Sequence, residues 1–167
     1  MKPGNHPDFF RLAAPEGRSR ESTIRLDQDG RFWHDGVPVE HSKMARAFAS
    51  WIARHPDDGR FILSNGYDWT YIEVEDTPYF VISVRERQGR PSILLSDGSE
   101  EPLAAETLWI GPREALYVSV KGGVFEARFT QSAQLALAPW LVEGPGSMPV
   151  LLVQGRRFEV RQAHGTC

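Results

Sequence analysis

The sequence is poor in cysteine, in long apolar runs and in net charge, and each shortage excludes a class of protein. The single cysteine, Cys167, is the last residue and cannot form an intrachain disulfide. No run of about 18 apolar residues occurs, so we expect no membrane-spanning helix. Residues 1–22 lack the apolar core of a signal peptide and are predicted to form a flexible N-terminal arm. We therefore expect a bacterial-type cytoplasmic protein without membrane contact.

The net charge is only −3, but the charges are unevenly distributed. Residues 61–120 contain four basic and ten acidic side chains, whereas residues 121–167 contain five basic and three acidic ones. Non-specific binding to duplex DNA requires a basic surface that displaces counterions, and the acidic middle segment opposes it. We therefore predict no non-specific duplex DNA binding, while the basic last segment could still hold one small anion.

Motifs of common catalytic and phosphate-binding sites are also missing. The sequence has no Gly-x-Ser-x-Gly nucleophile elbow and no glycine-rich phosphate loop of the Walker or Rossmann type. We therefore predict no catalytic residue, no metal site and no cofactor, and the leading expectation is a non-enzymatic binding module.

An imperfect internal repeat is the most informative feature that is present. Residues 36–39 and the apolar segment 45–52 are echoed by residues 123–126 and 133–141. Each copy contains a glycine turn, a short strand, an apolar helix that ends at a Trp, and a further strand. The repeat predicts an α+β fold of two related halves with antiparallel sheets, in which each half is one copy of a duplicated β-hairpin–helix–strand unit. We place these halves at residues 23–88 and 89–167, because Gln88-Gly89-Arg90-Pro91 is a turn sequence.

The two predicted helices have recognisable ends. Ser42 is a candidate cap for the first, whose apolar spacing extends to His55. Thr130 or Ser132 is a candidate cap for the second, which is predicted to run to about Leu141. Pro139 inside this helix predicts a kink or an early end.

Two strands stand out between the helices. The segment 69–75 alternates, so that four side chains are predicted to share one face: Trp69, Tyr71, Glu73 and Glu75. The segment 79–87 alternates in the same way, and it is predicted to place Phe80, Ile82 and Val84 on one face.

A ligand site can be assembled from these elements. Trp69 and Tyr71 could stack on a flat ring, and Glu73 could accept hydrogen bonds from its edge. Positive charge in the last segment is carried by Lys121, Arg128, Arg156 and Arg157, of which we select Lys121 and Arg128 to neutralise an anion. His34 completes the predicted ligand-binding set. On the alternative interpretation, these side chains form solvated strand faces that bind nothing.

Two further functions remain open. The first is a metal-assisted hydrolase that uses the side chains of Glu73, Glu75, Asp76 and His34. The second is a protein–protein interaction module that binds no small ligand and offers an open sheet edge. For all three functions we expect a monomer or a weak homodimer.

Four segments resemble a known bacterial family, the domain of unknown function 1285. They are Asp29–Val39, Asp58–Phe61, Ile72–Phe80 and Leu116–Gly123, of which Val74-Glu75-Asp76-Thr77-Pro78 is the most specific part. The resemblance implies a duplicated α+β core whose C-terminal half is superficially like a pleckstrin-homology domain. It also implies a nucleotide-like ligand between the halves and a part in signalling, but no activity. Residues 63–69 depart from the family pattern.

Overall fold

The computed structural model describes residues 2–163, and these form two compact units. The N-terminal unit extends to Pro78 and the C-terminal unit begins at Tyr79. The turn sequence at residues 88–91 predicts a boundary after residue 88. The observed division lies earlier because the strand Tyr79–Arg87 forms its sheet hydrogen bonds with strands of the C-terminal unit. Cys167 lies outside the described residues.

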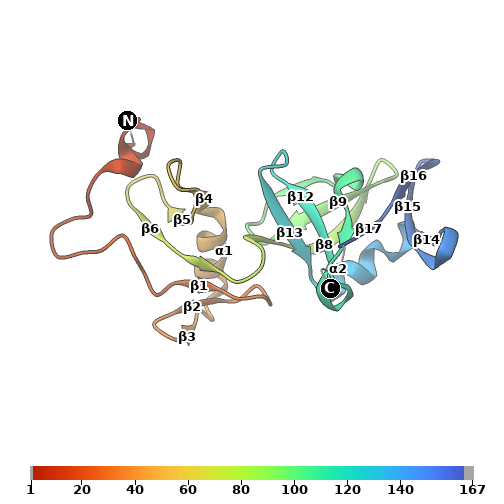
Figure 1. Cartoon of the computed structure of the whole chain (residues 1–167), viewed down its shortest axis with the longest axis horizontal. Helices are drawn as coiled ribbons and strands as arrows, with labels where there is room; N and C mark the ends of the chain where they lie inside the picture. Colours follow the sequence, from red (N-terminus) through yellow and green to blue (C-terminus); the bar gives the residue numbers. More distant parts are fainter. Residues whose placement is uncertain (1, 164–167) are drawn as a thin grey trace. The chain divides into compact units, whose positions relative to one another are not determined.

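The N-terminal unit contains two sheets (Figure 1, red to yellow-green). The first has the strand order β3-β2-β1-β7, with β1 (Arg25–Leu26), β2 (Phe32–His34), β3 (Val37–Pro38) and β7 (Glu73–Val74). The second is antiparallel and has the order β4-β5-β6, with β4 (Ile52–Arg54), β5 (Phe61–Ser64) and β6 (Trp69–Tyr71). The helix α1 (Ser42–Ser50) precedes the second sheet, and two short 3-10 helices precede the first: η1 (Pro3–Asn5) and η2 (Phe9–Arg11).

Helix α1 is shorter than its apolar spacing predicts. The Nδ1 atom of His41, not the side chain of Ser42, caps it by accepting a hydrogen bond from the amide of Met44 at 3.4 Å. The helix ends at Ser50, and the next residues form β4, in which Ile52 lies opposite Leu63 of β5. A buried β-branched residue such as Ile52 is compatible with a strand as well as with a helix, so the pairing with β5 decides the local structure here.

The predicted flexible arm is packed onto the N-terminal unit. The side chain of Phe9 is only 4% exposed and packs with Ile62 and Trp69, whose indole nitrogen donates a hydrogen bond to the Phe9 carbonyl. The guanidinium group of Arg11 donates two hydrogen bonds to the carboxylate of Asp57. Two aromatic residues of the arm, Phe9 and Phe10, therefore complete the apolar core around Ile62 and Trp69.

A buried carboxylate organises the first hairpin of the N-terminal unit. Asp27 is 9% exposed, and its oxygens accept hydrogen bonds from the amides of Asp29 and Arg31 and from the indole nitrogen of Trp33. Burial opposes ionisation of this carboxyl, but the three donors outweigh it and hold the pKa of Asp27 below its usual value. Its charge is thus part of the turn between β1 and β2.

The C-terminal unit contains a seven-stranded sheet in the order β10-β9-β8-β13-β12-β11-β17 (Figure 1, green to blue). Its strands are β8 (Tyr79–Arg87), β9 (Arg90–Leu95), β10 (Glu100–Pro102), β11 (Trp109–Ile110), β12 (Leu116–Val120), β13 (Phe125–Phe129) and β17 (Arg161–Gln162). The pairs β8–β13 and β11–β17 are parallel, and the other neighbours are antiparallel. The core lies around β8, β9, β12 and β13, where Val81, Ile93, Val118 and Ala127 are fully buried.

A helix and a second, antiparallel sheet lie between β13 and β17 in the chain. Thr130 caps α2 (Gln131–Leu137), which packs against β8 and β13, and Pro139 lies in a 3-10 turn that ends it. The second sheet consists of β14 (Leu141–Glu143), β15 (Pro149–Val153) and β16 (Arg156–Glu159). The 3-10 helices of this unit are η3 (Ala105–Thr107), η4 (Pro112–Glu114), η5 (Ala138–Trp140) and η6 (Pro145–Ser147).

These elements confirm the predicted α+β class. The sheets β4-β5-β6 and β14-β15-β16 are antiparallel as predicted, whereas the other two sheets also contain parallel pairs. The expected strand 79–87 is present, but a β-bulge between Val81 and Ser83 shifts its alternation and leaves Ile82 38% exposed. No helix among residues 2–163 is both long enough and apolar enough to cross a membrane.

Replacing Phe9 by Ala should destabilise the N-terminal unit by about 3 kcal/mol, because the change leaves a cavity beside Ile62 and Trp69. Urea unfolding followed by tryptophan fluorescence measures this loss. The matched control is Leu12→Ala in the same arm, where the side chain is 54% exposed and should matter little. Equal, small effects of both changes would show that the arm is not part of the core.

Replacing Asp27 by Asn should cost about 1–2 kcal/mol at pH 7, because a neutral amide accepts the three hydrogen bonds less strongly than a carboxylate. Because the pKa of Asp27 is lower in the folded protein than in the unfolded chain, the ionised carboxylate stabilises the fold fully above the unfolded pKa of about 4. This stabilisation is lost as the pH falls through the pKa of the folded state. Urea unfolding of wild type and variant at several pH values should therefore show a difference that shrinks below pH of about 4. Asp29→Asn, at an exposed position of the same turn, should show no such convergence.

Candidate functional site

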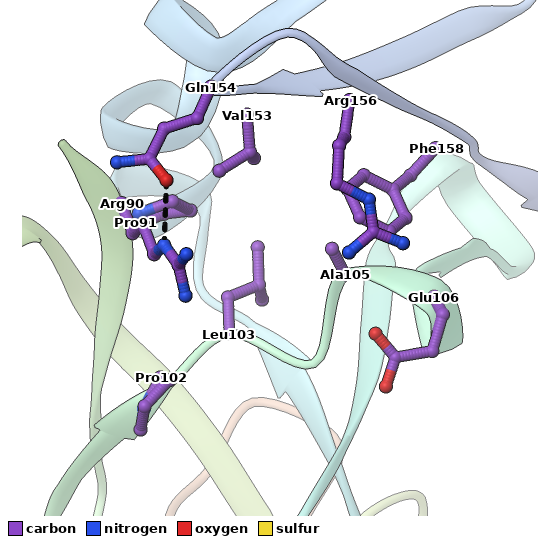
Figure 2. A pocket seen from close by; sticks show the side chains of 10 residues that line it. All are labelled: Arg90, Pro91, Pro102, Leu103, Ala105, Glu106, Val153, Gln154, Arg156 and Phe158. Atoms are coloured by element: carbon purple, nitrogen blue, oxygen red, sulfur yellow. Dashed lines mark hydrogen bonds between the residues drawn. The ribbon is translucent and has the colours of Figure 1, made fainter.

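A cavity of about 410 Å³ lies within the C-terminal unit. It is bordered by the start of β9, the end of β10, the start of η3 and the β15–β16 hairpin (Figure 2). The lining residues are Arg90, Pro91, Pro102, Leu103, Ala105, Glu106, Val153, Gln154, Arg156 and Phe158. A volume of about 300–1,000 Å³ with an apolar lining and a few polar groups is typical of small-molecule sites.

Two tight turns direct the strands β9 and β16 past the cavity. The β8–β9 turn has positive φ at Gln88 (53°) and Gly89 (77°), and it directs the chain into β9 at Arg90. The β15–β16 turn has the same form at Gln154 (48°) and Gly155 (81°). Because strand side chains alternate, Arg156 and Phe158 then lie on one face of β16, toward the cavity.

A single glutamine joins the two turns at the rim of the cavity. The Oε1 atom of Gln154 accepts a hydrogen bond from Nε of Arg90 at 2.9 Å, and its Nε2 donates to the carbonyl of Gln88 at 2.8 Å. These two bonds fix the amide orientation and hold the Arg90 guanidinium by one edge. Its terminal nitrogens remain as donors for a ligand.

The other charged groups lie across the opening from Arg90. Figure 2 shows Arg156 and Glu106 on the opposite side, with Leu103 between the two sides. The Arg156 guanidinium lies 5.1 Å from the centre of the Phe158 ring, a cation–π contact that restrains it. Two arginines and one glutamate leave the lining with a positive balance.

This arrangement is suited to holding an anion over an apolar floor. Guanidinium groups stay protonated at any ordinary pH, so they donate hydrogen bonds but do not transfer protons. Leu103 and Ala105 are buried and present apolar surface at the base of the cavity. The geometry therefore favours binding of a small molecule that carries an acidic group and an apolar portion.

The aromatic strand face predicted from the sequence is not a single face. Residues 69–75 form two strands, β6 and β7, in different sheets, because the amide of Ile72 bonds to Phe61 while that of Glu73 bonds to Ile24. Trp69 is 5% exposed, with the Arg20 guanidinium 4.5 Å from its ring centre. Stacking of a ligand on Trp69 would require displacing the groups that already cover it.

Tyr71 and Glu73 do line a common hollow, a shallow one of about 480 Å³ in the N-terminal unit. The Arg60 guanidinium covers the Tyr71 ring at 3.7 Å, and the Tyr71 hydroxyl donates to Asp58 at 2.7 Å. That hydrogen bond raises the pKa of Tyr71. Glu73 is exposed, and its carboxylate has no hydrogen-bond partner among residues 2–163.

The predicted basic pair has separate surroundings. Lys121 donates through Nζ to Asp97 at 2.7 Å and to Ser99 at 2.8 Å, so its charge is already paired. Burial raises the pKa of Asp97, but hydrogen bonds from Lys121 and Ser99 outweigh it and hold that pKa below the usual value. Arg128 is half-buried on β13, opposite Tyr117 of β12.

The residues of the hydrolase alternative do not converge on one point. Among residues 2–163 no group of three or more His, Cys, Asp or Glu side chains could hold a metal ion. The Glu75 carboxylate binds Arg25 at 2.6 Å and accepts a hydrogen bond from the amide of Gln28. His34 is exposed, with Nε2 3.6 Å from a carboxylate oxygen of Asp35.

The cavity involves residues that the sequence interpretation did not select. Arg156 is one of four basic candidates, whereas Arg90 lies in the predicted domain boundary and Glu106 is not among the predicted site residues. The sequence does contain one signal for this cavity: the turns Gln88-Gly89 and Gln154-Gly155 are each followed directly by an arginine. Nothing in the sequence indicated that these turns meet.

Comparison with known proteins confirms the family resemblance. Residues 14–77 match the N-terminal domain of the domain of unknown function DUF1285. The fold is similar to a DUF1285 family protein from Silicibacter pomeroyi, with a TM-score of 0.65 and 20% identity over 91% of this chain and 92% of that one. A DUF1285 family protein from Shewanella baltica gives a TM-score of 0.57 and 16% identity over 72% of this chain and 94% of that one.

The class defined by these findings is an α+β protein of two units. Within it, residues 14–77 carry the N-terminal domain of DUF1285, a domain to which no function is attached. No curated protein matches the sequence.

Replacing Lys121 by Met should destabilise the C-terminal unit by about 1–3 kcal/mol, because it leaves the largely buried Asp97 carboxylate without its cation. Urea unfolding at pH 7 tests this, with Lys43→Met at an exposed position of α1 as the control. An unchanged stability of the Lys121 variant would mean that this lysine is free to serve a ligand, as the sequence predicts.

Proposed function

We propose that this protein is a non-enzymatic binding module for a small anionic ligand, held in the cavity of the C-terminal unit. The observation that carries the proposal is the pair of arginines, Arg90 and Arg156, on opposite sides of a cavity with an apolar floor. Charge-assisted hydrogen bonds from guanidinium groups are the usual means of holding carboxylates and phosphates.

The nucleotide-like ligand, the signalling role and the cytoplasmic location remain predictions from the sequence and the family resemblance. This proposal keeps the small anionic ligand but changes the residues. Arg90 and Arg156 replace Lys121 as the groups that neutralise its charge, since Lys121 is paired with Asp97. Phe158 and Leu103 replace Trp69 as the apolar contacts.

We also infer that the two units descend from one duplicated unit. In the N-terminal unit the hairpin β2–β3 is followed by α1 and the sheet β4-β5-β6. In the C-terminal unit the hairpin β12–β13 is followed by α2 and the sheet β14-β15-β16. The shared order supports the repeat in the sequence, and the likeness to a pleckstrin-homology domain stays a prediction.

A thermal-shift screen with inorganic phosphate, small carboxylates, mononucleotides, dinucleotides and cyclic nucleotides tests the binding proposal. A ligand at about a hundred times its Kd should stabilise the protein by about 2.7 kcal/mol and raise its Tm. Arg90→Ala and Arg156→Ala should each weaken that ligand by about 2 kcal/mol, or roughly thirtyfold in Kd.

The matched control is Arg157→Ala, which removes the same charge from the same strand but does not line the cavity. Weakening by all three changes alike would indicate a general charge effect. A ligand that binds all three variants as tightly as wild type would occupy another site, and the cavity would lose its proposed role.

A further inference from the structure

Glu106 is the one acidic side chain that lines the cavity, and it is unused by the fold. Three other acidic residues, which lie in the nearby segment 97–101, have hydrogen-bond or ion-pair partners. Asp97 pairs with Lys121, Glu100 accepts hydrogen bonds from Arg87 and Ser92, and Glu101 accepts from the amide of Lys121. Glu106 is exposed, and its carboxylate has no hydrogen-bond or ion-pair partner within the described residues 2–163.

An unpaired carboxylate in an anion-binding cavity limits which anions fit. It repels a ligand that carries only negative charge, and it attracts a ligand that carries an ammonium or another N–H donor near the same place. Glu106 therefore distinguishes ligands that the two arginines would accept equally.

Glu106 and Arg156 lie on the same side of the cavity, and this placement suggests how a ligand could meet both. Figure 2 shows both side chains on one side of the cavity and Arg90 on the other, with Leu103 between them. A guanidinium and a carboxylate that line the same side of a cavity without pairing to each other are complementary to the carboxylate and ammonium of an amino acid, respectively. The Arg90 guanidinium, held by Gln154, is then available for a second acidic group across the apolar floor.

We propose that the ligand is an amino dicarboxylate: one carboxylate binds Arg156, the ammonium binds Glu106, the second carboxylate binds Arg90, and the carbon chain lies over Leu103. This inference rests on the proposed function, since it names the ligand class of the same cavity. It adds a specificity-determining role for Glu106.

Isothermal titration of the full-length protein with L-glutamate and with glutarate tests the ligand class, because glutarate has the same carboxylates without the amine. Wild type should bind glutamate about tenfold more tightly than glutarate. Glu106→Gln, which keeps the size but removes the charge, should weaken glutamate and strengthen glutarate by about three- to tenfold each. Opposite signs for the two ligands are the decisive result, since loss of folding would weaken both.

Glu159→Gln is the matched control, because it removes the same charge from the strand of Arg156 without lining the cavity. Equal affinities for the two acids, unaffected by Glu106→Gln, would overturn the ligand class and leave the proposed function standing. Binding of a phosphate or nucleotide through Arg90 and Arg156, with no binding of glutamate or glutarate, would likewise overturn the ligand class and leave the proposed function standing. If no carboxylate, phosphate or nucleotide binds the cavity, both proposals fail.

Discussion

The pairing of β8 on both of its edges is the constraint on which the C-terminal unit depends. β8 is antiparallel to β9 and parallel to β13, so that Val81 and Phe129 are buried in the middle of the sheet. Between β8 and its parallel partner, the chain must form β9 to β12, and α2 then packs back on β8 and β13. The same strand ends in the turn that places Arg90, so the central pairing also positions the candidate site.

The candidate site exists because two hairpin turns, far apart in the chain, meet at one amide. Gln154 both accepts from Arg90 and donates to the Gln88 carbonyl, and this double role restrains the side of the cavity that carries Arg90. Arg156 is restrained by its contact with Phe158. A ligand that meets restrained donors loses less binding free energy to ordering of the protein, which favours a cavity built in this way as a binding site.

In the N-terminal unit, aromatic and charged residues that are typical of a binding surface serve the fold. Trp69 is enclosed by Phe9, Phe10 and Arg20, all from the N-terminal arm. The Arg60 guanidinium lies on Tyr71 and also binds Glu21 through two hydrogen bonds. Aromatic rings and arginines contact one another for the same reasons that they contact ligands, so their presence in a strand does not by itself distinguish the two uses.

The sequence by itself determined what depends on neighbouring residues. Alternation indicated the strand 79–87, and two candidate cap residues, one of them Thr130, indicated the start of α2. Family-specific segments identified DUF1285. Tertiary structure decided the break at Ile72, the early end of α1 and the meeting of Arg90 with Gln154. The reason is physical: local patterns specify backbone conformation, whereas long-range strand pairing and burial decide which distant residues share a surface.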